Sequence, residues 1–369
     1  MKIKLVFLVL GMGLLLNLTS CQVGRFIVYN FADVKDHKKF PKRTIKAPQT
    51  TFHFTETTNA KVPKKYKNDS TGVEMSFEKY LEEQNTLAFL IIKNDTIHYE
   101  KYFDGYKQNS VVPSFSMAKS VISMLIGIAI EEKYIGSVND SVGKYVDDLK
   151  DKKLQNTRLE ELLQMTSGLD FSESYYSPFA DAAAFYYGRN LDKKSKRLKI
   201  NPKAENTFEY TSGSTQLLTM VLDRALGKTT VSEYLQEKIW QPIGAKYNTS
   251  WSLDKKNGIE KGFCCLNATA IDYAKLGRLY LKKGKFQEKQ IVPKDWVERS
   301  TKIDTSNGSA AYYQYQFWLP TANGDFLMDG FLGQYVYVNP EKELIIVRLG
   351  KKEGDVDWWK VFPYLASKY

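Results

Sequence analysis

Histidine is scarce in this chain of 369 residues, and its scarcity argues against two common kinds of hydrolytic centre. The only histidines are His37, His53 and His98. A zinc site built from clustered histidines and carboxylates is therefore not expected. A Ser-His-Asp hydrolase is not expected either, because no Gly-x-Ser-x-Gly turn occurs in the sequence. Any hydrolytic chemistry must use a base other than histidine.

Cysteine is equally rare, with Cys21, Cys264 and Cys265 only. Adjacent cysteines seldom form an unstrained bridge, and Cys21 has no evident partner, so we expect no structural disulfide. The adjacent pair could fill a core or have a redox or covalent role.

Motifs for nucleic-acid recognition are also missing. The composition is that of a globular protein, with 43% hydrophobic and 26% charged residues, and the formal net charge is +11. No RNP-type aromatic motif, helix-turn-helix signature or zinc-finger spacing accompanies this charge, so no nucleic-acid partner is expected. A basic surface instead suits anionic neighbours such as a cell envelope.

The only long apolar run lies at the start of the sequence. Residues 1–20 carry two lysines followed by Leu5–Leu16, which is the pattern of a secretory leader and is too short for a stable spanning helix. Leu18-Thr19-Ser20-Cys21 resembles a bacterial lipobox, in which the cysteine is diacylated. We expect residues 1–20 to be a lipoprotein signal peptide and Cys21 to be lipidated. The protein would then be anchored in the bacterial envelope, at the outer membrane or on the periplasmic face.

The rest of the chain predicts a tether followed by one α/β (α+β) domain. Residues 21–73 are rich in Lys and Thr and predict a basic tether that lies along the domain surface. The domain covers residues 74–369. Strand-like hairpins occur near both of its ends, and the signals between them are helical. This order predicts an antiparallel sheet from residues 85–115 and 310–369, flanked by helices, with a mostly helical region over 116–309.

One Ser-x-x-Lys motif stands at the start of a long apolar helix. The motif occurs four times, but only Ser116-Met117-Ala118-Lys119 opens such a helix, which extends to about Glu132. A serine there lies near unpaired amides and the positive end of the helix dipole. Lys119 lies one turn later on the same face, and burial would lower its pKa toward that of a proton acceptor. The alternative is that Ser116 merely caps the helix and Lys119 lies on the surface.

A second motif, Tyr210-Thr211-Ser212, precedes another helix. Together with Ser114-Phe115-Ser116-Met117-Ala118-Lys119-Ser120 it resembles the serine β-lactamase and penicillin-binding protein superfamily. Within that superfamily the chain is most similar to class C β-lactamases, related esterases and 6-aminohexanoate-dimer hydrolases. The resemblance extends from about residue 85 to 365 and includes the segments 100–106, 162–169, 272–279 and 333–338.

The resemblance implies a β-lactamase/transpeptidase-like fold and a serine hydrolase that cleaves an ester or amide. Ser116 would form the acyl-enzyme, with Lys119 and Tyr210 sharing the role of general base; the sequence does not choose between them. Ser212 would support Lys119 or pass a proton to the leaving group. The oxyanion hole would use the amide of Ser116 and one near Gly330 and Phe331. No metal or organic cofactor is required.

The chain departs from the family pattern at its third motif. β-Lactamases and penicillin-binding proteins carry Lys-Thr-Gly or a His variant there, whereas Phe326–Gly333 keeps the glycines and lacks the cation, as in the esterase and amide-hydrolase branch. A substrate carboxylate would lose its natural partner, and Asp329 would repel it if it faced the cleft. The resemblance also points to substrate contacts from Tyr175, Asp181 and Asn267, although such residues can equally serve packing.

Two alternatives stay open. One is a β-lactamase or DD-peptidase that acts on cell-wall-like substrates. The other is a catalytically silent envelope-binding protein, which the joint presence of Ser116, Lys119 and Tyr210 disfavours. We expect a small ester, amide or peptide as substrate and a monomeric chain.

Overall fold

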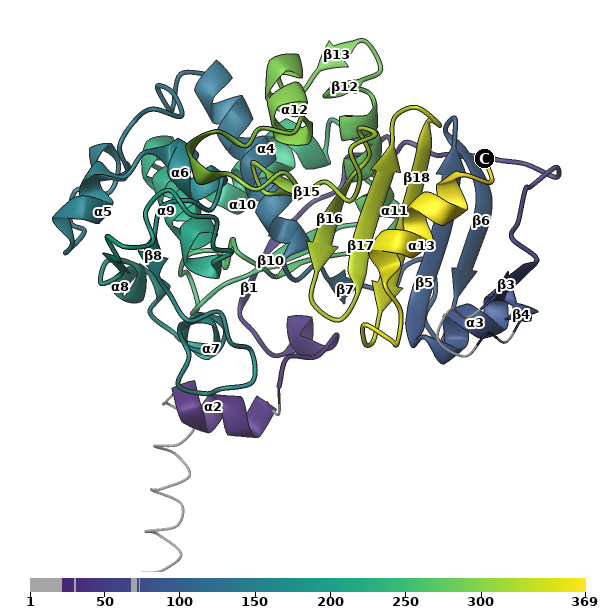
Figure 1. The fold of residues 1–369 in the computed structure, drawn as a ribbon, viewed down its shortest axis with the longest axis horizontal. Coiled ribbons are helices and arrows are strands. Elements are labelled where there is room, and N and C mark those ends of the chain that lie inside the picture. Colours follow the sequence, from purple (N-terminus) through teal and green to yellow (C-terminus); the bar gives the residue numbers. More distant parts are fainter. Residues whose placement is uncertain (1–21, 30, 68–71, 73) are drawn as a thin grey trace, which may run out of the picture.

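The computed structural model describes residues 22–29, 31–67, 72 and 74–369 (Figure 1). The largest sheet has eight strands in the order β14-β15-β16-β17-β18-β5-β6-β2. Neighbouring strands are antiparallel except β2 and β6, which run parallel. In the same order the strands are Tyr313–Gln314, Phe317–Trp318, Phe326–Gly330, Gln334–Asn339, Leu344–Gly350, Thr86–Lys93, Thr96–Tyr102 and Thr55–Glu56.

The strands β5 and β18 lie at the centre of the sheet and are buried along nearly their whole length. Because their side chains are apolar on both faces, both faces of these strands are covered by other elements. Alternate side chains of a strand point to opposite faces. Leu90 and Val347 belong to the large core on the side of α11 (Ala270–Leu281), whereas Phe89 and Ile346 pack beneath α3 (Phe77–Glu83) and α13 (Trp358–Ala366). Figure 1 shows α13 lying across β17, β18 and β5.

Helices make up most of the other half of the molecule. The central one, α4 (Met117–Glu131), is buried along nearly its whole length because its sequence is apolar on all sides. α9 (Ser212–Leu226) packs against α4, and α6 (Leu159–Leu163) packs against α9. The other helices are α2 (Gln22–Tyr29), α5 (Lys152–Asn156), α7 (Asp181–Tyr187), α8 (Leu191–Ser195), α10 (Val231–Leu235) and α12 (Lys294–Thr301).

The structure also contains a second sheet, of four antiparallel strands, which the sequence does not predict. Its order is β1-β10-β11-β7, and the strands are Lys42–Ile45, Thr249–Ser252, Leu266–Ala268 and Val112–Pro113. β10 and β11 lie within the region 116–309 that the sequence predicts as helical. Such short strands carry too few residues for a recognisable alternating pattern. The remaining strands of the described residues form three two-stranded sheets: β3 (Lys65–Lys67) with β4 (Glu74–Ser76), β8 (Leu169–Asp170) with β9 (Lys199–Ile200), and β12 (Lys285–Phe286) with β13 (Lys289–Gln290).

The structure corrects the tether predicted for residues 21–73. Its described part lies along the domain but is built into both sheets, since β1 pairs with β10 and β2 pairs with β6. Phe40, Ile45 and Phe54 are buried in the main core, which explains the pairing energetically: each removes a large apolar side chain from water. The leader expected at residues 1–20 and the lipidated Cys21 lie outside the described residues. Within the described part of the chain, no helix has the length and apolar character needed to cross a membrane.

The predicted fold class is confirmed. An antiparallel sheet built from segments near both ends of the domain is flanked by helices, with a mostly helical region inserted between them. The two predicted hairpins are β5–β6 and β17–β18. Pairing of segments far apart in the sequence places the start of α4 beside β16, where the candidate site lies.

Candidate active site

Ser116 stands in a turn between β7 and α4. The amide of Ser114 donates to the carbonyl of Leu266 at 2.7 Å, which ties this turn to the four-stranded sheet. Phe115 then turns the chain with a φ of 44°, in the left-handed region. The side chain of Ser116 makes no capping bond to the helix. Its hydroxyl instead accepts a hydrogen bond from Lys119 Nζ at 3.1 Å, so the structure does not favour the simple capping role.

Lys119 is buried, with only 1% of its surface exposed, and is not a surface lysine. Its amine donates to Ser116 Oγ at 3.1 Å, Ser212 Oγ at 3.1 Å and the carbonyl of Phe263 at 3.0 Å. Burial lowers the pKa of Lys119 to about 8, while the negative charges of Glu173 and Asp329 oppose this shift. The amine therefore loses its proton far more readily than a solvent-exposed lysine and becomes unprotonated as the pH rises through about 8.

Tyr210 is the third residue of the catalytic group that the sequence predicts. The Lys119 amine lies 4.9 Å from the centroid of the Tyr210 ring. The hydroxyl of Ser116 lies close enough to the phenol oxygen to lower the phenol pKa. Burial outweighs this effect, and with Tyr175, Tyr313 and Glu173 nearby the pKa of Tyr210 lies well above its usual value. Tyr210 is therefore a neutral phenol beside a partly neutral amine.

Glu173 is a member of the site that sequence reasoning missed. Its carboxylate accepts the backbone amide of Ser212 at 2.7 Å and the hydroxyl of Ser212 at 2.6 Å. Tyr175 donates its hydroxyl to the same carboxylate. Since Ser212 gives its proton to Glu173, its oxygen is left to accept from Lys119. No spacing rule marks this residue, because it lies in a loop without a recognisable pattern.

Strand β16 reaches the nucleophile turn because Gly330 has no side chain. A Cβ atom at this position would lie 2.2 Å from the carbonyl oxygen of Ser114, closer than any real contact. Phe331 follows directly, and its ring packs against Phe115 and Tyr175 with centroids 5.8 and 5.1 Å apart. Ser116 and Phe331 therefore border the same small pocket.

Asp329 points to the other face of β16, away from this pocket. Trp359 of α13 donates its indole N–H to Asp329 at 3.0 Å. Burial raises the pKa of Asp329 to about 7, and the bond from Trp359 and the charge of Lys119 oppose the shift. Asp329 is not among the residues that line the pocket, so it affects Lys119 by charge without facing a substrate.

The pocket beside Ser116 is narrow and apolar. Its volume is about 30 Å³, and its walls include Phe115, Tyr186, Tyr187, Phe263 and Phe331. None of the described residues that line it is an arginine, histidine or lysine. A wider groove of about 890 Å³ shares Ala32, Tyr175 and Phe331 with this pocket and so adjoins it. Its far end is polar and includes Glu83, Lys352, Glu353 and Asp355.

The predicted substrate contacts are only partly in place. Tyr175 lines both the pocket and the groove. Asp181 lines neither, because its carboxylate accepts from the amide and hydroxyl of Ser172, at 3.0 and 3.1 Å, and closes the loop before α7. Asn267 is buried in β11, where its amide nitrogen donates to Ser250 and Ser252. Both side chains make local hydrogen bonds outside the pocket, so the structure does not bring them beside Ser116.

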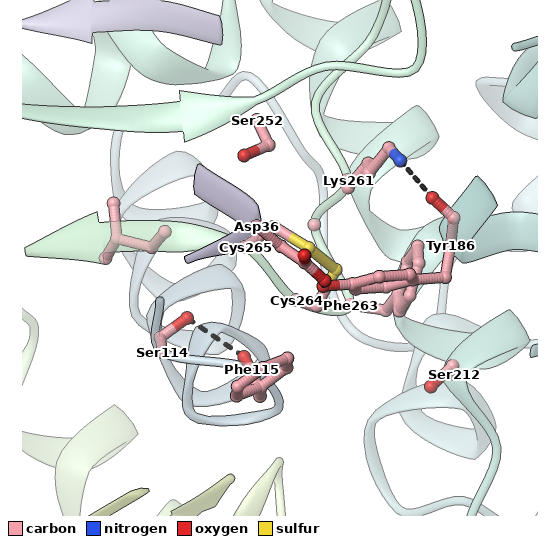
Figure 2. The surroundings of a disulfide bond; sticks show 12 residues. Asp36, Ser114, Phe115, Tyr186, Ser212, Ser252, Lys261, Phe263, Cys264 and Cys265 are labelled. Carbon is pink, nitrogen blue, oxygen red and sulfur yellow. Dashed lines mark hydrogen bonds between the residues drawn. A yellow bond between two sulfur atoms is a disulfide. The ribbon is translucent and has the colours of Figure 1, made fainter. Parts of the chain in front are cut away.

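The structure also corrects the expectation that the adjacent cysteines stay unbridged. Cys264 and Cys265 form a disulfide whose Cα atoms are 3.7 Å apart, the spacing of any two neighbouring residues. The chain turns here, with a φ of 75° at Cys265, and spacing in the sequence cannot reveal such a turn. Figure 2 shows the bridge among Phe115, Tyr186 and Phe263. Cys264 lines the small pocket, and the preceding Phe263 carries the carbonyl that holds Lys119.

The site combines a hydroxyl, a buried amine, a phenol and a carboxylate. Within the described part of the chain, no group of three or more histidine, cysteine, aspartate or glutamate side chains is arranged to hold a metal ion. The fold and this group of side chains define a β-lactamase-like hydrolase. The model of the family described as Beta-lactamase matches residues 76–359, and the chain belongs to that family.

Relatives within this fold are named as hydrolases of amides and esters. The 6-aminohexanoate-dimer hydrolase of Paenarthrobacter ureafaciens is 25% identical over 308 residues, which cover 76% of this chain and 77% of that protein. A structure from Bacillus anthracis with the provisional name 6-aminohexanoate-dimer hydrolase has a TM-score of 0.80 at 23% identity, covering 91% of this chain and 93% of that one. A family VIII carboxylesterase has a TM-score of 0.62 at 13% identity, covering 79% and 95%.

Proposed function

We propose that this protein is a serine hydrolase that cleaves a carboxylic ester or amide through an acyl-enzyme on Ser116. The observation that carries the proposal is the buried amine of Lys119, 3.1 Å from the Ser116 hydroxyl and with a pKa lowered to about 8. An unprotonated amine at this distance can accept the hydroxyl proton as the serine attacks a carbonyl.

Lys119 is the general base in this account, and Tyr210 acts as a neutral proton carrier. Ionising Tyr210 would be costly, because burial raises the pKa of its phenol well above the usual value. Its hydroxyl can instead relay a proton: it gives its own proton to the leaving group and takes in exchange the proton that Lys119 accepted from Ser116, so Lys119 is again unprotonated. Water then attacks the acyl-enzyme and gives a proton to Lys119, the acid is released, and Lys119 returns that proton to the Ser116 oxygen.

Developing negative charge on the substrate oxygen would be stabilised by backbone amides. We assign the amides of Ser116 and Phe331 to this role, because both residues border the pocket and Gly330 lets β16 approach the nucleophile turn. Each such donor typically stabilises the transition state by about 3 kcal/mol. Ser212 and Glu173 position the Lys119 amine and are not required to touch the substrate.

The lining of the pocket favours an ester or linear amide with a small apolar acyl group over a β-lactam. Its walls are aromatic, and no cation among them would pair with the carboxylate of a β-lactam or of a D-Ala-D-Ala end. The amide and ester hydrolases among the relatives support this choice. The substrate would be a small molecule, and the chain would act as a monomer.

The proposed location is the bacterial envelope, with the chain anchored through a lipid on Cys21. The lipobox-like segment Leu18–Cys21 supports it, and so does the disulfide of Cys264 and Cys265, since disulfides persist mainly in oxidising compartments.

An active-site fluorophosphonate tests the proposal directly. The purified chain should gain one adduct on Ser116, and the Ser116→Ala variant should gain none. A parallel comparison of p-nitrophenyl acetate, linear amides and nitrocefin should show the ester turned over fastest. Absence of both an adduct and turnover would favour a silent binding protein, and faster turnover of nitrocefin would favour a β-lactamase.

A further inference from the structure

Two segments near the mouth of the active-site groove expose large apolar side chains to solvent. In the first, Ile27 and Val28 of α2 are 65% and 59% exposed, and Phe31, just after the helix, is 45% exposed. In the second, the loop before α7 exposes Tyr176 by 70% and Phe179 by 81%. We call these five residues the apolar rim. Exposed apolar groups gathered in this way usually mark a binding surface.

The two segments of the apolar rim lie side by side. The rings of Phe31 and Tyr176 have centroids 6.3 Å apart. The opposite side of α2 is anchored, because Phe26 is buried and packs on Tyr187 of α7 with centroids 5.2 Å apart. Figure 1 shows α2 at the edge of the molecule, directly beyond α7. α2 is thus a helix with one side packed on the domain and Ile27 and Val28 in solvent, which is the form of an interfacial helix.

The apolar rim also borders the path to Ser116. Phe31 and Tyr176 line the wide groove, which adjoins the pocket that Ser116 lines. Tyr176 further packs on Phe331 of the pocket wall, with centroids 6.2 Å apart. Whatever covers the apolar rim therefore lies at the entrance of the active site.

Sequence and charge next to the rim identify the occupant. Cys21, the expected lipidation site, lies six residues before Ile27 in the sequence, so a membrane held through its lipid would lie close to α2. After α2, the segment 35–46 exposes five lysines, namely Lys35, Lys38, Lys39, Lys42 and Lys46. Lys39 donates to the carbonyl of Tyr29 at the end of α2, at 3.1 Å, and pairs with Asp36, which places the start of this basic segment against the helix. Exposed apolar groups beside clustered lysines match a surface of anionic lipids.

We propose that the apolar rim is a docking face for an anionic lipid bilayer, and that docking holds the mouth of the active-site groove against the membrane surface. An anchor alone does not fix the orientation of the domain, because a chain held only at its end could present any face to the membrane. Docking would fix that orientation. The route of the substrate rests on the proposed function: substrate would reach Ser116 from the bilayer surface.

Docking can be measured without any assay of activity. The full chain carrying Tyr176→Cys is labelled with an NBD fluorophore and incorporated in vesicles of phosphatidylglycerol and phosphatidylcholine, some with nitroxide-bearing lipids. Tyr364→Cys, on the exposed side of α13, is the matched control, and the unsubstituted chain corrects for labelling elsewhere. We expect the nitroxide lipids to quench the label at 176 by about threefold and the label at 364 hardly at all. Equal quenching at both positions, or stronger quenching at 364, overturns the proposal.

A variant of the rim separates docking from anchoring. In the double variant Ile27→Ser and Phe179→Ser, the quenching at 176 should fall toward the value at 364, whereas Val62→Ser and Ile303→Ser, at exposed sites outside the rim, should leave it unchanged. The rim variant should also hydrolyse a short-chain acyl ester of a long-chain alcohol in vesicles several-fold more slowly, with soluble p-nitrophenyl acetate unaffected. If the unsubstituted chain hydrolyses neither ester, the proposed function fails, while the quenching result still decides the docking.

Discussion

Glu173 binds Ser212 through both oxygens of its carboxylate, one accepting the backbone amide at 2.7 Å and the other accepting the hydroxyl at 2.6 Å. This pair fixes the oxygen of Ser212 as an acceptor for the amine of Lys119, 3.1 Å away. Lys119 is therefore held from three directions, by Ser212, by the carbonyl of Phe263 and by the nucleophile itself. The geometry makes Glu173 a positioning residue with an electrostatic effect on the base.

Glu173→Gln should change both the rate and its dependence on pH. The charge of Glu173 raises the pKa of Lys119, so its removal lowers that pKa, and the rise of kcat/KM should move to lower pH. An amide cannot accept both donors of Ser212 as the carboxylate does, so the maximal rate should fall by about tenfold. A pH profile of ester hydrolysis measures both effects. A lower rate with an unmoved profile would assign Glu173 a purely structural role.

The unsubstituted chain should become more active as the pH rises through about 8. The base must be unprotonated to act, and burial places the pKa of Lys119 near that value. Activity should be low when the amine is protonated below pH 7 and should level off above pH 9, as judged by kcat/KM for p-nitrophenyl acetate corrected for spontaneous hydrolysis. Lys119→Arg keeps a cation but supplies no base near neutral pH. We expect it to lose at least about a hundredfold in rate, and a retained profile in this variant would contradict the assignment.

Asp329→Asn should shift the same profile in the same direction but by less. Asp329 raises the pKa of Lys119, although its effect comes after that of Glu173. Because Asp329 does not line the pocket, KM should change little. Asp357→Asn, at an exposed position beside α13, is the matched control and should leave the profile in place. A large change in KM with no shift in the profile would instead place Asp329 in contact with the substrate.

Reduction of the disulfide should slow the enzyme reversibly. The bridge closes the turn that carries the carbonyl of Phe263, an acceptor for Lys119, and Cys264 forms part of the pocket wall. Freeing this turn should lower kcat several-fold, with recovery after reoxidation, and mass spectrometry would follow the gain and loss of two thiol protons. The double variant Cys264→Ser and Cys265→Ser should be slow from the start and insensitive to a phosphine reductant. Equal sensitivity of this variant would show that the reductant acts elsewhere.

Arg348→Met should destabilise the fold more than most substitutions. The guanidinium of Arg348 is buried and donates to the carbonyls of Gly333, Gln84 and Lys352 at 2.8, 2.7 and 3.0 Å. Methionine would leave these acceptors without their donor, and we expect a loss of about 3 kcal/mol in the free energy of unfolding. Denaturant unfolding measures it against Lys351→Met, whose exposed ion pair with Asp104 should contribute little to stability.

The parts of the site that the sequence could predict are those set by local geometry or by a known motif. The spacing of Ser116 and Lys119 puts them on one helix face whatever the rest of the chain does, and the apolar sequence around them predicts their burial. The hydrophobic patterns likewise predict the two hairpins, because alternation and turn residues are local features. Tyr210 is different: its approach to the helix depends on tertiary packing, and only the family resemblance singled it out.

Other parts of the site depend on contacts that no local pattern records. Glu173 reaches Ser212 through a loop without regular structure, and the turn that allows Cys264 and Cys265 to bridge is a feature of the backbone. Residues 31–67 carry short strands whose partners lie far along the chain, so their composition indicated a tether. The family pattern suggested Asp181 and Asn267 as contacts, but here each is engaged in local hydrogen bonds away from the pocket.

The central claim is that Ser116 becomes covalently acylated with the help of Lys119. Rapid acid quenching during turnover of an aryl ester, followed by peptide mass spectrometry, tests it most directly. The account predicts a transient acyl group on the peptide that contains Ser116, formed faster as the pH rises toward 8 and absent from the Ser116→Ala variant. Full turnover by Ser116→Ala, or an acyl group found on another residue during productive turnover, would contradict it.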